Sequence, residues 1–190
     1  MRSPYRPVRT VPPVTTPVSL DEAKAHLRID GDDEDLLISS LIEAATGHLD
    51  GADGVLGRCL VTQTWTVRFD YWASVLRLPF PDVRSVEISF GGAEPAPASA
   101  YDLIEDSSSA LIYLDADFAR PAPVEGRGGI TVTLVAGYGD AADVPAPIKA
   151  AILLTVGALF ENREQTIVGA SVAEHPLARA LMAPFRRIAF

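Results

Sequence analysis

The side chains best suited to chemistry in this 190-residue chain are one cysteine and three histidines. A nucleophile such as Cys59 or a serine needs a base within reach. The sequence offers three bases, His26, His48 and His175, and none stands in a catalytic signature such as G-x-S-x-G. His26 and His48 fall in amphipathic helical patterns, and His175 precedes Pro176 at an expected helix start. The sequence therefore predicts no active site and no enzyme.

The acidic run of residues 30–35 partly matches a calcium-binding loop. Asp30, Asp32 and Glu34 alternate as in an EF-hand. Asp35 stands where the loop needs glycine, however, and Leu41 replaces its final bidentate acid. The pattern is better explained as acids that cap the start of a helix.

Other motifs for cofactors and metals fall short in the same way. Asp115 and Asp117 could form a carboxylate pair, but they are typical of a solvated turn after a strand. The glycines of residues 51–57 follow a helix and lack dinucleotide-loop spacing. Cys59 has no second soft ligand for zinc and no disulfide partner, which favours a cytosolic site of synthesis. We expect no cofactor and no metal.

The net charge of −9 is unevenly distributed. Residues 1–18 carry Arg2, Arg6 and Arg9 without an acid, whereas residues 19–144 hold 22 of the 25 acids. Such an acidic body disfavours binding to the phosphate backbone of DNA. A second interpretation is that the acidic charge serves only to keep the protein in solution. Because residues 150–160 form the longest nearly uncharged stretch, well short of the ~20 residues of a membrane span, no membrane association is expected.

Hydrophobic periodicity predicts an α+β fold. Ser19 and Glu22 form a capping box that begins a helix, and alternation starts at Leu60. We expect a small core of three to four helices, with an antiparallel sheet of about four to six strands inserted between the second and the long third helix. The segments are an extended Pro-rich arm (1–18), N-terminal helices (19–57), a β region (60–139), a long helix (145–163), and a loop, short helix and tail (164–190).

The last short helix is expected to have one apolar side. Leu177, Ala180 and Leu181 lie on that side, and Pro184 should end the helix. Residues 164–174 lack periodicity and are predicted to form a loop.

Two other classes of function remain open on the residues alone. A small hydrolase could assemble its site from distant residues such as His48 or Cys59. A binding module could instead use the β region, with Trp65, Tyr71 and Trp72 as its contact surface. A deep pocket that holds His48 or Cys59 would favour the hydrolase. A Trp72 exposed on a flat face would favour the binding module.

The order of several motifs resembles the head-tail connector (adaptor) proteins of tailed bacteriophages and phage-derived gene transfer agents. Two short helices joined by an acidic turn are followed by a strand, a Gly-Tyr-Gly turn, a long helix and a final motif. These patterns lie at residues 18–28, 32–37, 130–135, 137–139, 144–149 and 177–186.

The resemblance implies a structural adaptor in the neck of a virion, made in the bacterial host cytoplasm. Such proteins form a ring, commonly of twelve subunits, with the portal protein above, a stopper or tail-completion protein below, and DNA passing through without specific binding. The residues expected to grip the portal are Met182, Phe185, Arg186, Arg187, Ile188 and Phe190, and the expected arm contacts are Arg2, Arg6 and Arg9. A frayed tail and a disordered leader are the competing interpretations of these ends.

Overall fold

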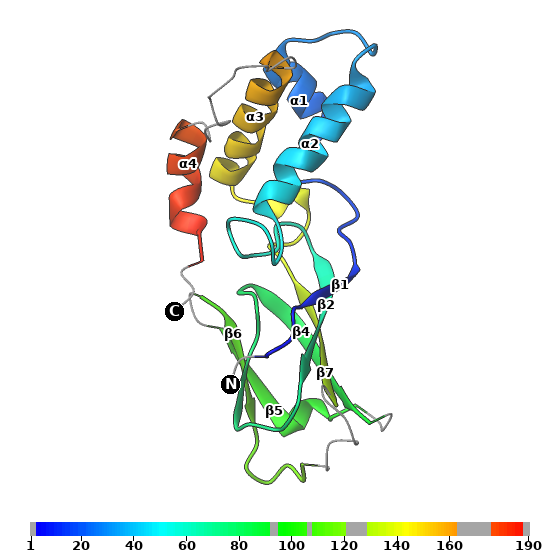
Figure 1. Ribbon diagram of the computed structural model, residues 1–190, viewed down its shortest axis with the longest axis vertical. Coiled ribbons are helices and arrows are strands. Elements are labelled where there is room, and N and C mark those ends of the chain that lie inside the picture. Colours follow the sequence, from blue (N-terminus) through cyan, green and yellow to red (C-terminus); the bar gives the residue numbers. More distant parts are fainter. Residues whose placement is uncertain (1–2, 92–94, 106–107, 121–128, 163–175, 188–190) are drawn as a thin grey trace. The chain divides into compact units, whose positions relative to one another are not determined.

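The computed structural model describes residues 3–91, 95–105, 108–120, 129–162 and 176–187 (Figure 1). The chain divides into two compact units. The β unit comprises Met1–Val14, Thr62–Tyr138 and Arg187–Phe190, and the helical unit comprises Thr15–Val61 and Gly139–Arg186. Each unit is therefore assembled from segments that are distant in the sequence.

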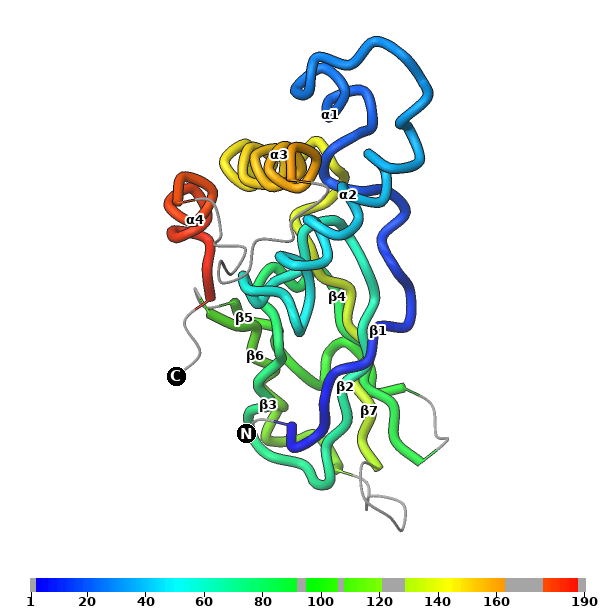
Figure 2. Tube along the Cα trace, turned by 45° about the horizontal axis from the view of Figure 1, so that its top comes forward, coloured from blue at the N-terminus to red at the C-terminus, as the bar shows by residue number. Residues whose placement is uncertain are grey.

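Four α-helices in the described residues build the helical unit, and they confirm the predicted helical core. They are α1 (Leu20–Leu27), α2 (Asp35–Leu49), α3 (Ala146–Glu161) and α4 (Pro176–Met182). Helix α3 packs against each of the other three, and both views place it between α4 and the α1–α2 pair (Figures 1 and 2). None of the helices in the described ranges is long and apolar enough to span a membrane.

Helix α2 has two neighbouring stripes at helical spacing, and only one of them forms the core. The first stripe is Leu37, Leu41, Ala44 and His48, and the second is Ile38, Ile42, Ala45 and Leu49. Ile38, Ile42, Ala45 and Leu49 are buried. The neighbouring stripe, which ends at His48, is half-buried or exposed. Only one face of α2 therefore packs within the unit, as expected for an amphipathic helix at a surface.

Helix α4 buries a side other than the one that carries Leu177, Ala180 and Leu181. Ala178 and Met182 are buried, whereas Leu177 is 53% exposed. This seven-residue helix is apolar on more than one side, so that contact with α3 decides which side is covered. Pro184 lies in a 3-10 turn directly after the helix, as expected of a helix-ending residue.

The β unit contains seven strands in the described residues, more than the predicted four to six. One antiparallel sheet has the order β1-β2-β7-β4 and the other β3-β6-β5. The strands are β1 (Val8–Val11), β2 (Gln63–Phe69), β3 (Val75–Arg77), β4 (Val83–Phe90), β5 (Tyr101–Glu105), β6 (Ala110–Leu114) and β7 (Ile130–Ala136). Sequence reasoning missed β1 and β5, which are both terminal strands.

Strand β2 confirms the predicted alternation. Its residues from Gln63 to Phe69 alternate between buried positions and half-buried or exposed ones, with Arg68 exposed. Trp65 packs on Phe80 with ring centroids 5.0 Å apart, and its indole N–H donates to Oε1 of Gln63 at 3.1 Å. The one polar residue on the buried face is thus hydrogen-bonded, as burial of an amide requires.

Strand β1 lies in the Pro-rich arm, where no strand was expected. It pairs with β2 at three positions, with Val8 opposite Thr66 and Val11 opposite Thr64. Proline lacks an N–H and is confined to sheet edges, and β1 is such an edge, flanked by Pro7 and Pro12. The prolines exclude a central strand but permit this one.

Candidate interaction surfaces

The residues considered for catalysis occupy structural or surface positions. Cys59 is fully buried in the helical unit, so its thiol is closed to a substrate. His26 and His48 lie on exposed positions of α1 and α2. His175 lies outside the described residues. This arrangement gives the hydrolase alternative no accessible nucleophile at Cys59.

The described residues contain no group of three or more histidine, cysteine, aspartate or glutamate side chains placed to hold a metal ion. Asp115 and Asp117 form a local turn, in which the Asp117 N–H donates to Oδ1 of Asp115 at 3.1 Å. Both side chains are exposed, which confirms the predicted solvated turn.

The acidic turn before α2 uses its carboxylates in ion pairs. Lys24 Nζ lies 2.8 Å from Oδ1 of Asp32 and 2.7 Å from Oδ1 of Asp35. Glu34 stands at the N-cap and Asp35 in the first turn of α2, so acids lie at the start of this helix as predicted, although Glu34 makes no side-chain capping bond. The ammonium of Lys24 lowers the pKa of Asp32, and the two carboxylates raise the pKa of Lys24. A lysine from α1 thus fixes the turn that leads into α2.

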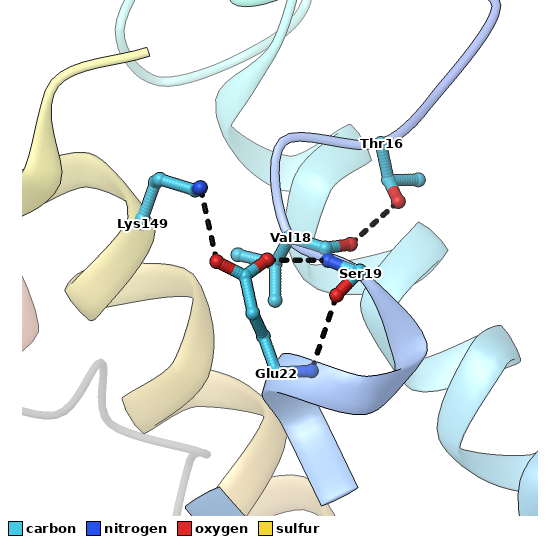
Figure 3. A network of polar contacts seen from close by, with 5 residues as sticks. All are labelled: Thr16, Val18, Ser19, Glu22 and Lys149. Carbon is cyan, nitrogen blue, oxygen red and sulfur yellow. Dashed lines mark hydrogen bonds and ion pairs between the residues drawn. The ribbon is translucent and has the colours of Figure 1, made fainter. Parts of the chain in front are cut away.

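The start of α1 is held by a small polar network (Figure 3). The Ser19 N–H donates to Oε2 of Glu22 at 2.8 Å, and the Glu22 N–H donates to Oγ of Ser19 at 3.1 Å. This is the predicted capping box. Oγ1 of Thr16 also donates to the Val18 carbonyl at 2.7 Å, which orders the residues that enter the helix.

Glu22 has a second role that sequence reasoning missed. Its Oε1 accepts from Nζ of Lys149 on α3 at 3.1 Å (Figure 3). The Ser19 N–H and then Lys149 lower the pKa of the Glu22 carboxyl. Two of the motifs behind the predicted resemblance, residues 18–28 and 144–149, therefore meet at a single carboxylate.

The Gly-Tyr-Gly turn of residues 137–139 is held from β4. Nε of Arg84 donates to the Gly137 carbonyl at 3.2 Å, and its Nη2 donates to the Tyr138 carbonyl. Gly137 and Gly139 have φ values of 134° and 137°, which favour glycine at both positions. The spacing of this motif has a conformational cause.

The C-terminal residues expected to bind a partner fall into different environments. Met182 is only 6% exposed and belongs to the core of the helical unit. Phe185 is half-buried and Arg186 is exposed. Nη1 of Arg187 donates to the Pro79 carbonyl within the β unit. The remaining two, Ile188 and Phe190, lie outside the described residues.

The N-terminal arm is anchored to the β unit by side chains. The Arg9 guanidinium lies 5.8 Å from the Trp65 ring centroid, and its Nη1 donates to Oε1 of Gln63 at 3.4 Å. The hydroxyl of Tyr5 donates to Asp70 at 2.5 Å. Arg6 is exposed, and Arg2 lies outside the described residues. From Ser3 onward the arm therefore has defined contacts.

The three aromatic residues considered as a binding surface do not form one flat face. Trp65 is only 7% exposed, whereas Tyr71 is 58% exposed. Trp72 packs edge-on against Phe90 and Phe118, with centroid separations of 5.4 and 5.6 Å. Trp65 and Trp72 are thus packed against other aromatic rings, whereas Tyr71 is exposed, so the three side chains share no contact surface for a binding module.

Almost all of the net negative charge of the chain belongs to one unit. The helical unit carries 15 acidic and seven basic residues, a net charge of −8. The β unit carries ten acidic and nine basic residues, a net charge of −1. The acidic body inferred from the sequence is therefore the helical unit.

Comparison with known proteins gives matches in both sequence and fold. Residues 17–64 match the family of phage gp6-like head-tail connector proteins. A chain from the virion of a native gene transfer agent (GTA) particle matches with a TM-score of 0.77 at 20% identity, over 98% of this chain and 97% of the other. No curated protein gives a significant match.

Two further structures are GTA necks. A chain from the neck of an empty GTA particle computed with C6 symmetry has a TM-score of 0.76 at 20% identity, covering 98% of this chain and 97% of that one. A chain from the neck of a native particle computed with C12 symmetry has a TM-score of 0.67 at 20% identity, covering 95% and 97%. The predicted resemblance is thus confirmed: residues 17–64 match the head-tail connector family, and the fold is shared with chains of GTA particles.

Proposed function

We propose that this chain is a structural head-tail adaptor without catalytic activity. It forms a ring of twelve subunits in the neck of a tailed phage or a gene transfer agent. The portal lies above the ring and a stopper or tail-completion protein below it, and DNA passes through the ring without specific binding.

The observation that carries this proposal is the extent of the fold match. A chain from a GTA virion matches over 98% of this chain, including both units, while the family match covers residues 17–64. The matched necks were computed with C6 and C12 symmetry, which supports a ring with a multiple of six subunits. The buried Cys59 and the surface histidines support a structural role.

The C-terminal segment is the proposed portal contact. The positions of its side chains restrict which of its residues can touch the portal. Phe185 and Arg186 follow α4 and offer an aromatic ring and an exposed guanidinium, the groups most often found at the centre of interfaces. Arg187, Ile188 and Phe190 continue this segment. Met182 contributes from the core by fixing α4, which positions the residues that follow it.

The charge division supports a second part of the proposal, in which the helical unit lines the DNA channel. A surface of charge −8 per subunit repels the DNA backbone, so a moving genome is not retained by the ring. A map of the assembled neck tests this directly. A channel lined by the nearly neutral β unit would contradict it.

Substitution of the half-buried Phe185 and the exposed Arg186 tests the portal contact. The double variant F185A/R186E should fold normally and lose incorporation into particles, measured by immunoblot of purified particles against a capsid standard. The matched control is R179E, which reverses an exposed arginine within α4. Normal incorporation of F185A/R186E would overturn the portal assignment. Absence of the wild-type chain from particles would overturn the adaptor role itself.

A further inference from the structure

We propose that copies of this chain join head to tail through their sheet edges, with β1 of one copy pairing with β5 of the next. This inference rests on the proposed ring and identifies the surfaces that join its subunits. Four observations on the β unit support it: exposed apolar side chains, open strand edges, opposite charges and the separation of the two strands.

The exposed apolar side chains gather at these two places. Eight large apolar residues are exposed in the part of the chain that the structure describes, and five lie on or next to β1 and β5. They are Val8, Val11 and Val14 along the arm, Ile104 on β5, and Tyr113 on the neighbouring strand β6. Scattered exposed apolar residues need no explanation, whereas clusters mark interaction sites.

Both strands end their sheets. Strand β1 is the terminal strand of the four-stranded sheet, and β5 is terminal in the three-stranded sheet. A terminal strand presents a row of backbone donors and acceptors that can receive another strand. Pro7 and Pro12 limit pairing to the four residues of β1, and β5, with five residues, is long enough to pair with all of them.

The charges beside the two strands are opposite. Residues 1–18 carry three arginines and no acid, and exposed Arg6 and Arg9 flank Val8. Strand β5 carries exposed Asp102 and Glu105 on either side of Ile104. Pairing β1 with β5 therefore brings opposite charges together around an apolar centre, and the same complementarity disfavours β1–β1 and β5–β5 pairs.

The β1 edge and the β5 edge of one copy cannot pair with each other. Strand β1 lies across the β unit from β5 and β6 in both views, and the two strands belong to different sheets (Figures 1 and 2). The partner of each edge must then be another copy. Two different surfaces that recognise each other form a head-to-tail contact, and such contacts generate closed rings when the rotation between copies closes.

A cysteine pair tests the contact in assembled particles. In the variant V8C/I104C, oxidation of purified particles should give a ladder of covalent multimers on a non-reducing denaturing gel, up to the complete ring. The native Cys59 is fully buried and stays in place. The matched control is V8C/Y71C, because Tyr71 is as exposed as Val8 and lies off the proposed edge. The control should remain monomeric.

The outcomes separate this inference from the proposed function. If V8C/I104C is present in particles at the wild-type level and gives no ladder, the β1–β5 contact is wrong while the adaptor role stands. A ladder in both variants would show unspecific contact and also overturn the inference. If the wild-type chain is absent from particles, it is the adaptor role that fails.

Charge substitutions cover the case in which cysteine variants do not assemble. V8D places an acid opposite the acids of β5 and should weaken each contact about fivefold, the upper range for a cross-strand pair. I104K alone should weaken it similarly through the arginines of the arm. The double variant V8D/I104K should restore incorporation of the chain into particles. Failure of the double variant to exceed both single variants would overturn the pairing.

Discussion

The helical unit and the β unit of this chain divide its tasks differently. The helical unit carries a net charge of −8 and nearly all of the family match, which spans residues 17–64. The β unit is almost neutral, and six of the eight exposed large apolar residues of the described chain belong to it. The charge of the helical unit supports the proposed DNA channel, and the exposed apolar side chains of the β unit support the proposed contact between copies.

The difference also concerns how each unit is stabilised. The helical unit buries aliphatic side chains such as Ile38, Ile148 and Ile152, and it adds caps and ion pairs at its surface. The β unit buries large aromatic side chains, with Phe69 and Phe80 both at most 1% exposed. Its stability should therefore respond most to loss of buried volume.

The largest expected effect comes from truncating Phe69. This residue is fully buried on β2, so F69A should lower the free energy of unfolding by about 3–5 kcal/mol. Both tryptophans lie in the β unit, so their fluorescence in a urea titration follows that unit. The control is Y71A at a 58% exposed position, where a change within about 0.5 kcal/mol is expected.

The same titration tests whether the two units are energetically separate. Circular dichroism at the helical wavelength reports mainly on the helical unit. If F69A shifts the fluorescence transition without shifting the helical signal, the units unfold independently. Coincident shifts would show one cooperative domain. An F69A transition equal to that of Y71A would contradict the assignment of Phe69 to the core.

A smaller effect is expected from a glycine of the helical unit. A Cβ at Gly54 would lie 2.3 Å from the backbone carbon and oxygen of Leu49, so G54A must displace main chain. We expect a loss of about 1–3 kcal/mol in the stability of the helical unit, the usual range for overpacking. The control G47A meets nothing within 4 Å in α2 and should stabilise by up to about 1 kcal/mol. Equal melting temperatures for the two variants would contradict this local packing.

Much of the helical unit could be predicted from sequence because its signals are local. The capping box of Ser19 and Glu22 lies within four residues, and the core stripe of α2 repeats at helical spacing. The roles of Lys24 and Lys149 could not be predicted. Lys24 reaches across a turn, and Lys149 is 127 residues from Glu22, so only the packed helices bring these charges together.

The β unit was predicted where alternation is regular and missed where it is not. Strand β2 alternates over its length, whereas β1 is exposed at every position and β5 at three of five. A strand without a buried face has no period-two signal, so propensity alone could not identify it. These same two strands carry the proposed subunit contact. The surfaces most relevant to assembly were therefore the least visible in the sequence.

The smallest expected effect comes from removing the charge of Glu22. E22Q should lose the ion pair with Lys149 and weaken the capping box, at a cost of about 0.5–1 kcal/mol. The cost is modest because the Glu22 side chain is 46% exposed, which allows water to screen the pair. D21N is the control, since it removes a charge from the same turn of α1.

The pH dependence of E22Q distinguishes the ionised network from a packing effect. The pKa of Glu22 is lowered in the folded chain, so the unfolded chain takes up this proton first as the pH falls. The stabilisation by Glu22 is therefore present above its ordinary pKa of 4.5 and is lost as the pH falls through the lower folded value. Urea titrations should show the wild type more stable than E22Q at neutral pH, with the difference vanishing in acid. A difference that persists below the folded pKa would mean that the Glu22 side chain acts by packing. The helical unit would then be held by apolar contacts alone, which would remove its contrast with the β unit.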